Sequence, residues 1–420
     1  MVLCQNRATM YSGHWSENVK FLFAKKVKNT FFLWAFLLAL SVAFTSLLSA
    51  STNSWATVPA GMHDWWAGKL PAWVPRPKEP AHNVMTAAKV ELGRHLFYDK
   101  RLSANQEMAC ATCHLQEKAF TDGNAVSKGV TLEAGARSAM PLANVAYMPV
   151  LTWANPNIQS LETQALIPLF GEHPIEMGMA GREQALMQLF ATDKTYQVLF
   201  NQAFPQLSIM AKKDKNALYN LATMTQAIAS FERSLLSFNS PYDQFKYGGK
   251  INAISESAKR GEDLFFGEKL ECYHCHGGFN FTDNSNHQKL SFPEQGFHNT
   301  GLYNLDGKGA YPSHNIGIAE FTGQPLDMGK FRTPSLRNIA LTAPYMHDGS
   351  IASLEQVLTQ HYALAGKASA GPNGTSPIKN ETLVGFELSA QELKDIVAFL
   401  NTLTDTQFIQ NKAHSDPWKK

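Results

Sequence analysis

The sequence lacks the basic excess that binding to a nucleic-acid backbone requires. Its 37 Lys and Arg residues nearly equal its 35 Asp and Glu residues. The first 28 residues hold five basic side chains and one acid, so the rest of the chain carries 32 basic against 34 acidic residues. Because phosphate contacts depend on clustered Lys and Arg, this near-neutral body indicates that nucleic acid is not a partner.

Charge is absent from residues 31–50, and no acidic or basic residue follows before Asp64. Four lysines between positions 20 and 28 precede this apolar run, an order that predicts export of the remaining chain to the periplasm. Twenty apolar residues can cross a bilayer core of about 30 Å, so an inner-membrane anchor stays open beside a cleaved signal. Residues 1–58 are therefore expected to be an export signal or membrane anchor with a linker.

Cysteine is scarce, and four of the five cysteines fall into two C-x-x-C-H patterns. These patterns are Cys110-Ala-Thr-Cys113-His114 and Cys272-Tyr-His-Cys275-His276. The spacing is typical of haem c attachment, in which both thiols bond to the haem vinyl groups and the histidine is the proximal iron ligand. The sequence therefore predicts two covalently bound haem c groups.

Three other interpretations use the same cysteines, namely a zinc site, a redox-active Cys-x-x-Cys motif and two short disulfides. Four-ligand zinc sites usually pair two Cys-x-x-Cys elements, whereas here each pair has its own histidine. A thioredoxin-like motif would occur once beside a β-α-β pattern. Haem attachment accounts for both patterns, and it agrees with export because c-type haem is attached outside the cytoplasm.

Little of the sequence alternates as strands do, so the predicted fold class is mainly α. Similar helical stretches precede the two haem motifs, at residues 92–98 and 259–266. This weak repeat, one domain length apart, predicts two cytochrome c-like haem domains related by duplication.

Helix and turn signals place the boundary between the two expected domains. Apolar residues recur at helical spacing over residues 217–238, which predicts one uninterrupted helix, and the turn at 239–241 ends it. We expect the two haem domains at residues 80–245 and 250–410. Ser389 and Glu392 form a capping-box pattern that begins a last helix.

The sequence resembles the bacterial di-haem cytochrome c peroxidases and their MauG-like relatives over about residues 87–403. The resemblance is carried by residues 92–103, the first haem motif through residue 123, residues 144–147 and residues 331–349. It implies that hydrogen peroxide is reduced at the first haem, while the second haem stores and relays electrons. The implied electron donor is a cytochrome c or a cupredoxin.

The first haem is expected to have an open sixth position, because no histidine occurs between His114 and His173 to block it. Resemblance to the family places Gln164, Pro168 and Glu176 in the distal pocket. Glu176 would move the peroxide proton and Gln164 would orient peroxide. The alternative for Glu176 is a solvated loop acid.

Trp153 resembles the tryptophan that carries electrons between the two haems of the family. The sequence departs from the family after this residue, where Ala-Asn-Pro-Asn replaces the common Asp-Gly-Arg. A buried structural tryptophan is therefore the alternative role.

The sixth ligand of the second haem separates the branches of the family. Ordinary peroxidases place methionine after the His-Asp-Gly sequence, and MauG-like members place tyrosine there. Resemblance to the latter implies Tyr362 as the iron ligand, with His361 and Met346 as alternatives. His347 is expected to be a structural residue or a partner of a haem propionate.

The family also holds Ca²⁺ between its haems with an asparagine side chain and two backbone carbonyls. Thr342 and Pro344 match the carbonyl donors, and Ser138 stands at the asparagine position. A hydroxyl is a weaker ligand for this cation than an amide carbonyl, so calcium stays an open expectation.

The sequence thus favours an exported di-haem peroxidase that reduces hydrogen peroxide to water with electrons from a redox protein. The second hypothesis is a MauG-like oxidant that modifies residues of a partner protein. The third is an electron-transfer cytochrome with two six-coordinate irons, against which the missing distal histidine argues. Association with the membrane and with a second copy of the chain both stay open.

Overall fold

The computed structural model describes residues 64–366 and 373–419. The predicted signal or anchor therefore lies outside the described residues. Within the described ranges, no helix is both long enough and apolar enough to cross a membrane. The expected boundaries of the two haem domains stay a prediction.

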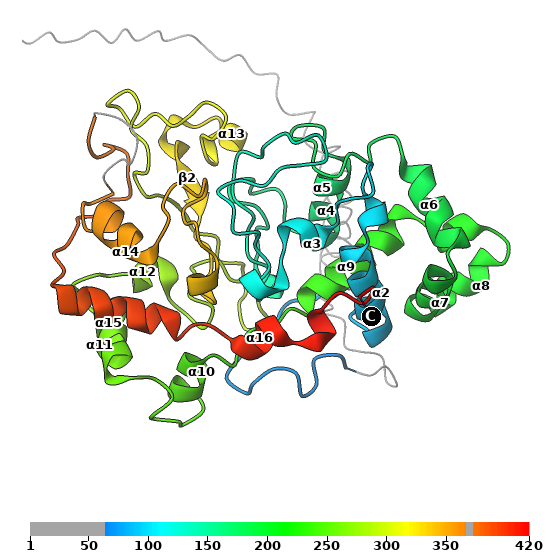
Figure 1. Cartoon of the computed structure of the whole chain (residues 1–420), viewed down its shortest axis with the longest axis horizontal. Helices are drawn as coiled ribbons and strands as arrows, with labels where there is room; N and C mark the ends of the chain where they lie inside the picture. Colours follow the sequence, from blue (N-terminus) through cyan, green and yellow to red (C-terminus); the bar gives the residue numbers. More distant parts are fainter. Residues whose placement is uncertain (1–63, 367–372, 420) are drawn as a thin grey trace, which may run out of the picture. The chain divides into compact units, whose positions relative to one another are not determined.

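Helices make up most of the regular structure, which confirms the mainly α fold class (Figure 1). Two long helices lie in each half: α2 (Ala87–Tyr98) and α9 (Leu221–Arg233), then α11 (Glu256–Phe266) and α15 (Ala390–Asn401). The haem motifs form two short helices, α3 (Cys110–Cys113) and α12 (Tyr273–His276). The other helices are α4 (Leu161–Gln164), α5 (Leu166–Phe170), α6 (Glu183–Thr192), α7 (Lys194–Ala203), α8 (Pro205–Ala211), α10 (Pro241–Lys246), α13 (Ala319–Thr322), α14 (Leu354–Gln356) and α16 (Thr406–Gln410).

Strand structure among the described residues is limited to one small antiparallel sheet. It pairs β1 (Phe297–Asn299) with β2 (Lys330–Arg332). In its register Phe297 faces Arg332 and His298 faces Phe331. This sheet brings two segments of the C-terminal half next to the second haem motif.

Side-chain caps set the beginnings of the long helices. The Thr86 hydroxyl accepts a hydrogen bond from the backbone N–H of Lys89 at the start of α2, and Ser255 caps α11 in the same way. Ser389 and Glu392 form the predicted capping box of α15, and this prediction is confirmed.

The expected uninterrupted helix over residues 217–238 is wrong at both ends. The Asn220 side chain accepts from the N–H of Thr223 and caps α9, so the helix begins at Leu221. At the other end, the Ser234 hydroxyl donates to the carbonyl of Phe231, just after the helix ends at Arg233. The apolar stripe is nevertheless buried beyond the helix, because Leu235 and Phe238 both enter the core.

A glycine lets the two long helices of each half approach closely. A Cβ atom added at Gly93 of α2 would lie 1.9 Å from the carbonyl oxygen of Ala227 in α9. A Cβ added at Gly261 of α11 would lie 2.0 Å from the carbonyl oxygen of Asp395 in α15. The two halves thus share the same helix contact, while their origin by duplication stays a prediction.

The C-terminal segment crosses from the second half to the first. α16 follows α15, and the chain after it returns to α2 (Figure 1). The Tyr98 hydroxyl donates to the carbonyl of His414, and the Trp418 indole donates to the carbonyl of His95. The end of the chain therefore holds the helix that precedes the first haem motif.

Candidate haem sites

The first haem motif holds its histidine in one orientation. His114 Nδ1 lies 2.7 Å from the carbonyl oxygen of Phe120, so Nδ1–H donates and Nε2 is left as the coordinating atom. Burial lowers the pKa of His114, which keeps the imidazole neutral as iron ligation requires.

The second haem motif repeats this arrangement. His276 Nδ1 lies 3.1 Å from the carbonyl oxygen of Phe281, and burial likewise lowers the pKa of His276. The four motif thiols are free rather than paired, which argues against two short disulfides. Among the described residues, the group that could hold a metal ion consists of Cys275, Asp283 and His298, so it does not join the two cysteine pairs as a four-ligand zinc site of both motifs would.

A cavity of about 340 Å³ opens beside the second motif. Cys272, Cys275 and His276 border it, so both attachment thiols and the proximal histidine reach one space. Its other apolar borders include Phe265, Leu270, Leu336, Ile339, Leu354, Ile396 and Leu400. Thiols, imidazole and apolar borders together fit a covalently attached haem.

Tyr362 borders this same cavity from the π-helical segment Val357–Tyr362. Burial raises the pKa of its phenol, and the nearby thiols of Cys275 and Cys272 raise it further. His361 is not among the described residues that border the cavity, whereas Met346 is. The geometry therefore favours Tyr362 over His361 as a ligand and keeps Met346 as the alternative. Single π turns inside helices are common at functional sites.

The predicted distal residues come together near the first motif. The backbone N–H of Met177 donates to the carbonyl of Pro168 at 2.9 Å, which places Glu176 beside α5. Gln164 ends α4, one turn before Pro168. Burial raises the pKa of Glu176. Burial also raises the pKa of the Cys110 thiol, and the Glu232 carboxyl and, least, the Glu176 carboxyl raise it further. The role of Glu176 in catalysis stays a prediction.

Trp153 borders the cavity of the second haem motif and forms hydrogen bonds with two distant parts of the chain. Its indole Nε1–H donates to the carbonyl of Ser138 at 2.9 Å. Its own carbonyl accepts the backbone N–H of Arg332 at 2.8 Å. Its role as an electron carrier stays a prediction.

The three residues predicted to hold calcium all border the cavity of the second haem motif. They are Ser138, Thr342 and Pro344. The Ser138 hydroxyl donates to the carbonyl of Met346 at 3.3 Å, and the Thr342 hydroxyl donates to the carbonyl of Ile339 at 3.1 Å. Calcium at this position stays a prediction.

Sequence reasoning missed a buried charged group behind the first haem site. Arg233 donates to both carboxylate oxygens of Glu162 at 2.8 and 2.9 Å, and the Asn83 amide donates to the same carboxylate at 2.7 Å. The neighbouring Glu232 is 5% exposed, and burial raises its pKa to about 8. No sequence signal marks this group, because its members lie far apart in the chain.

The fold and the two histidine sites define a c-type di-haem protein. A sequence model described as di-haem cytochrome c peroxidase matches residues 87–251. The methylamine utilization protein MauG of Methylophilus methylotrophus is 34% identical, over 80% of this chain and 90% of that relative. Cytochrome-c peroxidase IdrP1 of Denitromonas iodatirespirans is also 34% identical, over 83% of this chain and 90% of that protein. The chain belongs to the di-haem cytochrome c peroxidase family, and it is an oxidoreductase with haem c cofactors.

Similarity to solved structures agrees with membership of this family. The crystal structure of a MauG-like protein associated with microbial copper homeostasis shares 46% identity, with a TM-score of 0.79 over 85% of this chain and all of that one. The di-haem peroxidase BthA of Burkholderia thailandensis shares 19% identity with a TM-score of 0.59 and shows the fold alone.

Proposed function

We propose that the protein is a MauG-like di-haem enzyme that reduces hydrogen peroxide and takes the electrons from side chains of a partner protein. The observation that carries this proposal is Tyr362 at the cavity of His276. A thioether ligand raises the haem potential and suits an electron store, whereas a phenolate stabilises the higher oxidation states that a protein oxidant needs. The similarity to MauG and to a MauG-like structure supports the same branch.

The proposed reaction transfers two electrons from the partner protein to hydrogen peroxide. Hydrogen peroxide takes up two electrons and two protons and yields two molecules of water, while an aromatic side chain of the partner loses two electrons and two protons. Haem c supplies the iron at which the oxygen–oxygen bond breaks. Glu176 would be the acid that holds and moves the peroxide proton, and burial raises the pKa of its carboxyl. Trp153 provides an aromatic path toward the second site.

We propose the following cofactors, cellular location and partner for the enzyme. Cys110, Cys113 and His114 would hold one haem c, and Cys272, Cys275 and His276 would hold the other. Ser138, Thr342 and Pro344 would be the ligands of a Ca²⁺ ion, if the protein binds one. The leader exports the enzyme to the periplasm, where it is released or stays attached to the inner membrane. The relative with 46% identity is associated with copper homeostasis, so we place the partner among exported proteins that handle copper.

A second candidate function is the ordinary peroxidase with a cytochrome c or cupredoxin donor, which the sequence alone favoured. The cytochrome-c peroxidase at 34% identity supports it. Both functions use the first site in the same way, and they differ in where the electrons originate.

The experiment uses the full haem-loaded chain, whose mass must exceed that of the bare chain by two haems. The diferric protein receives one equivalent of hydrogen peroxide, with reduced cytochrome c, reduced cupredoxin or N-acetyltryptophanamide as the electron source. We expect a reaction without prior reduction, oxidation of the tryptophan probe by mass spectrometry and slow turnover of the small redox proteins. Rapid turnover with cytochrome c and an unchanged tryptophan probe would establish the second candidate instead.

A further inference from the structure

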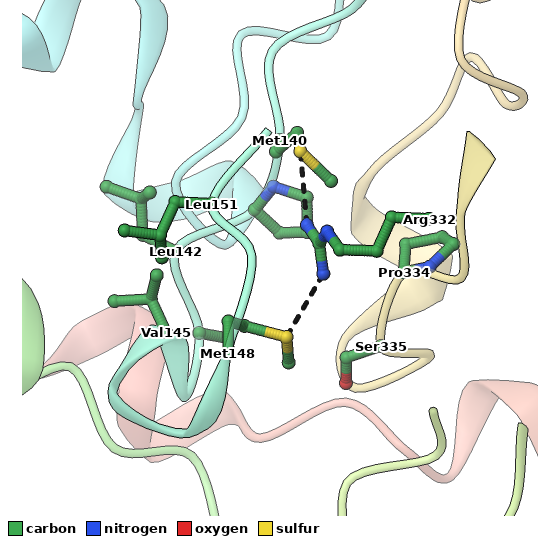
Figure 2. A pocket seen from close by; sticks show the side chains of 10 residues that line it. Met140, Leu142, Val145, Met148, Leu151, Arg332, Pro334 and Ser335 are labelled. Carbon is green, nitrogen blue, oxygen red and sulfur yellow. Dashed lines mark hydrogen bonds between the residues drawn. The ribbon is translucent and has the colours of Figure 1, made fainter. Parts of the chain in front are cut away.

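Arg332 is a buried cation without a matching anion. It lies at the end of β2 and is 5% exposed. Its guanidinium donates to the Sδ atoms of Met148 at 3.0 Å and Met140 at 3.1 Å (Figure 2). It also donates to the carbonyl of Thr152 at 3.2 Å. Methionine sulfur is a weak acceptor, so these contacts compensate little of the cost of burying the charge.

No carboxylate within residues 64–366 and 373–419 forms an ion pair with Arg332. Burial lowers the pKa of Arg332 to about 10, and the more distant Asp283 opposes this only in part. Asp283 itself is paired with His298 at 2.5 Å. Because buried arginine is rare unless it is paired, the environment of Arg332 favours binding of an anion that the described residues do not provide.

His347 is a second buried side chain that can donate a hydrogen bond, and it borders the cavity of the second haem motif. His347 is 5% exposed, and its ring stacks on Phe331 with 3.7 Å between centroids and 12° between planes. In the described part of the chain its Nε2 atom has no hydrogen-bond partner. Arg332 and His347 both border the cavity of the second haem motif. Arg332 also borders the small adjoining pocket of Figure 2, where its guanidinium contacts Met140 and Met148, which are not among the residues bordering the haem cavity.

Backbone hydrogen bonds tie both donors to Trp153. The N–H of Arg332 donates to the Trp153 carbonyl at 2.8 Å, and the Trp153 indole donates to the Ser138 carbonyl at 2.9 Å. The N–H of Ser138 then donates to the His347 carbonyl at 2.8 Å. The two donors and the tryptophan therefore form one connected unit on the border of the cavity.

We propose that Arg332 and His347 bind the propionate carboxylates of the haem attached through His276, and thereby fix the edge of that haem beside Trp153. This inference rests on the proposed haem at the second motif. The propionates are the charged groups of haem, and a guanidinium with a neutral imidazole donor matches two carboxylates. The haem supplies the counter-charge that Arg332 lacks, which accounts for a buried arginine held between two sulfur atoms.

The test compares three variants of the full haem-loaded chain: Arg332→Gln, Arg332→Lys and His347→Gln. The matched control is Arg337→Lys, because Arg337 is also buried and lies on the same segment, but already has Asp243 as its partner at 2.9 and 3.0 Å. Resonance Raman spectra report the propionate bending bands, and a redox titration reports the midpoint potential of each haem.

We expect Arg332→Gln to keep both haems, to shift a propionate band and to lower the midpoint potential of the second haem. The potential falls because a nearby positive charge favours the ferrous over the ferric state. Arg332→Lys should give a smaller change in potential, and His347→Gln should shift the propionate bands. Arg337→Lys should reduce thermal stability while leaving both the bands and the potentials unchanged.

Propionate bands and potentials that stay at their parent values in both Arg332→Lys and His347→Gln would overturn the inference. A band change that follows added acetate or phosphate in the parent protein would also overturn it, since an external anion would then occupy the site. Absence of haem at Cys272 and Cys275 in the parent protein would instead refute the proposed function. If the Arg332→Gln protein does not fold, the spectra and potentials of Arg332→Lys and His347→Gln test the inference in its place.

Discussion

Glu176 is a half-buried residue whose carboxyl lies near the thiols of the first haem motif. Glu176→Gln removes the proton that the acid would move but preserves size and hydrogen bonding. We expect this variant to keep both haems and nearly the same ferric spectrum while peroxide turnover falls by roughly 10²–10⁴-fold. Stopped-flow mixing of the diferric protein with hydrogen peroxide measures this. Parent-like turnover would assign the proton transfer to another group.

Tyr362 borders the second cavity close to the two attachment thiols. Tyr362→Phe removes the phenol oxygen and leaves the ring, so the low-spin ferric spectrum of the second haem should change while ligand binding at the first haem persists. Electron paramagnetic resonance resolves the two haems. Met346→Leu is the matched control, because Met346 borders the same cavity. A spectrum that changes in the control and not in Tyr362→Phe would identify methionine as the ligand.

Glu232 makes folding depend on pH, because burial raises its pKa to about 8. The folded chain holds this proton between about pH 4.5 and pH 8, where the unfolded chain has lost it, so stability falls as pH rises through this window. Each pKa unit of difference corresponds to about 1.4 kcal/mol. Glu232→Gln should weaken this fall and raise the free energy of unfolding at pH 8. Urea titrations from pH 5 to pH 9 measure it, and identical pH profiles would contradict the assignment.

At the scale of elements, the contact between α11 and α15 depends on the missing side chain of Gly261. Gly261→Ala brings a Cβ atom to 2.0 Å from the Asp395 carbonyl oxygen, so the helices must separate. We expect a loss of about 1–3 kcal/mol in the free energy of unfolding, typical of overpacking. Asp263→Ala, at an exposed position of the same helix, is the control for a chemical denaturation experiment. Equal midpoints for the two variants would show that the contact adapts.

At the scale of the whole molecule, the C-terminal segment reaches from the second half to the first haem motif. Phe120, whose carbonyl orients His114, packs against Phe408 and His414. Deletion of residues 412–420 should therefore lower thermal stability and alter the high-spin spectrum of the first haem, while the low-spin spectrum of the second haem stays unchanged. Calorimetry and electron paramagnetic resonance measure these effects. Equal changes at both haems would show a general loosening instead.

Features that depend only on neighbouring residues could be predicted from the sequence. Two C-x-x-C-H motifs need only covalent spacing, and the cap at Ser389 needs only a side chain that reaches three residues ahead, so both could be predicted. The structure preserves both local patterns. The family, the mainly α class and the enzyme class followed from those motifs together with the longer stretches that resemble di-haem peroxidases.

Which side chains share a site became clear only from the folded chain. Tyr362 borders the cavity of the second haem motif and His361 does not, although the two are adjacent in sequence, because neighbouring residues of a helical segment point in different directions. Arg332 lies between Met140 and Met148, nearly two hundred positions away, and Glu162 meets Arg233 and Asn83 in the same way. Burial and charge pairing depend on such distant contacts, and one sequence carries no local pattern that reports them.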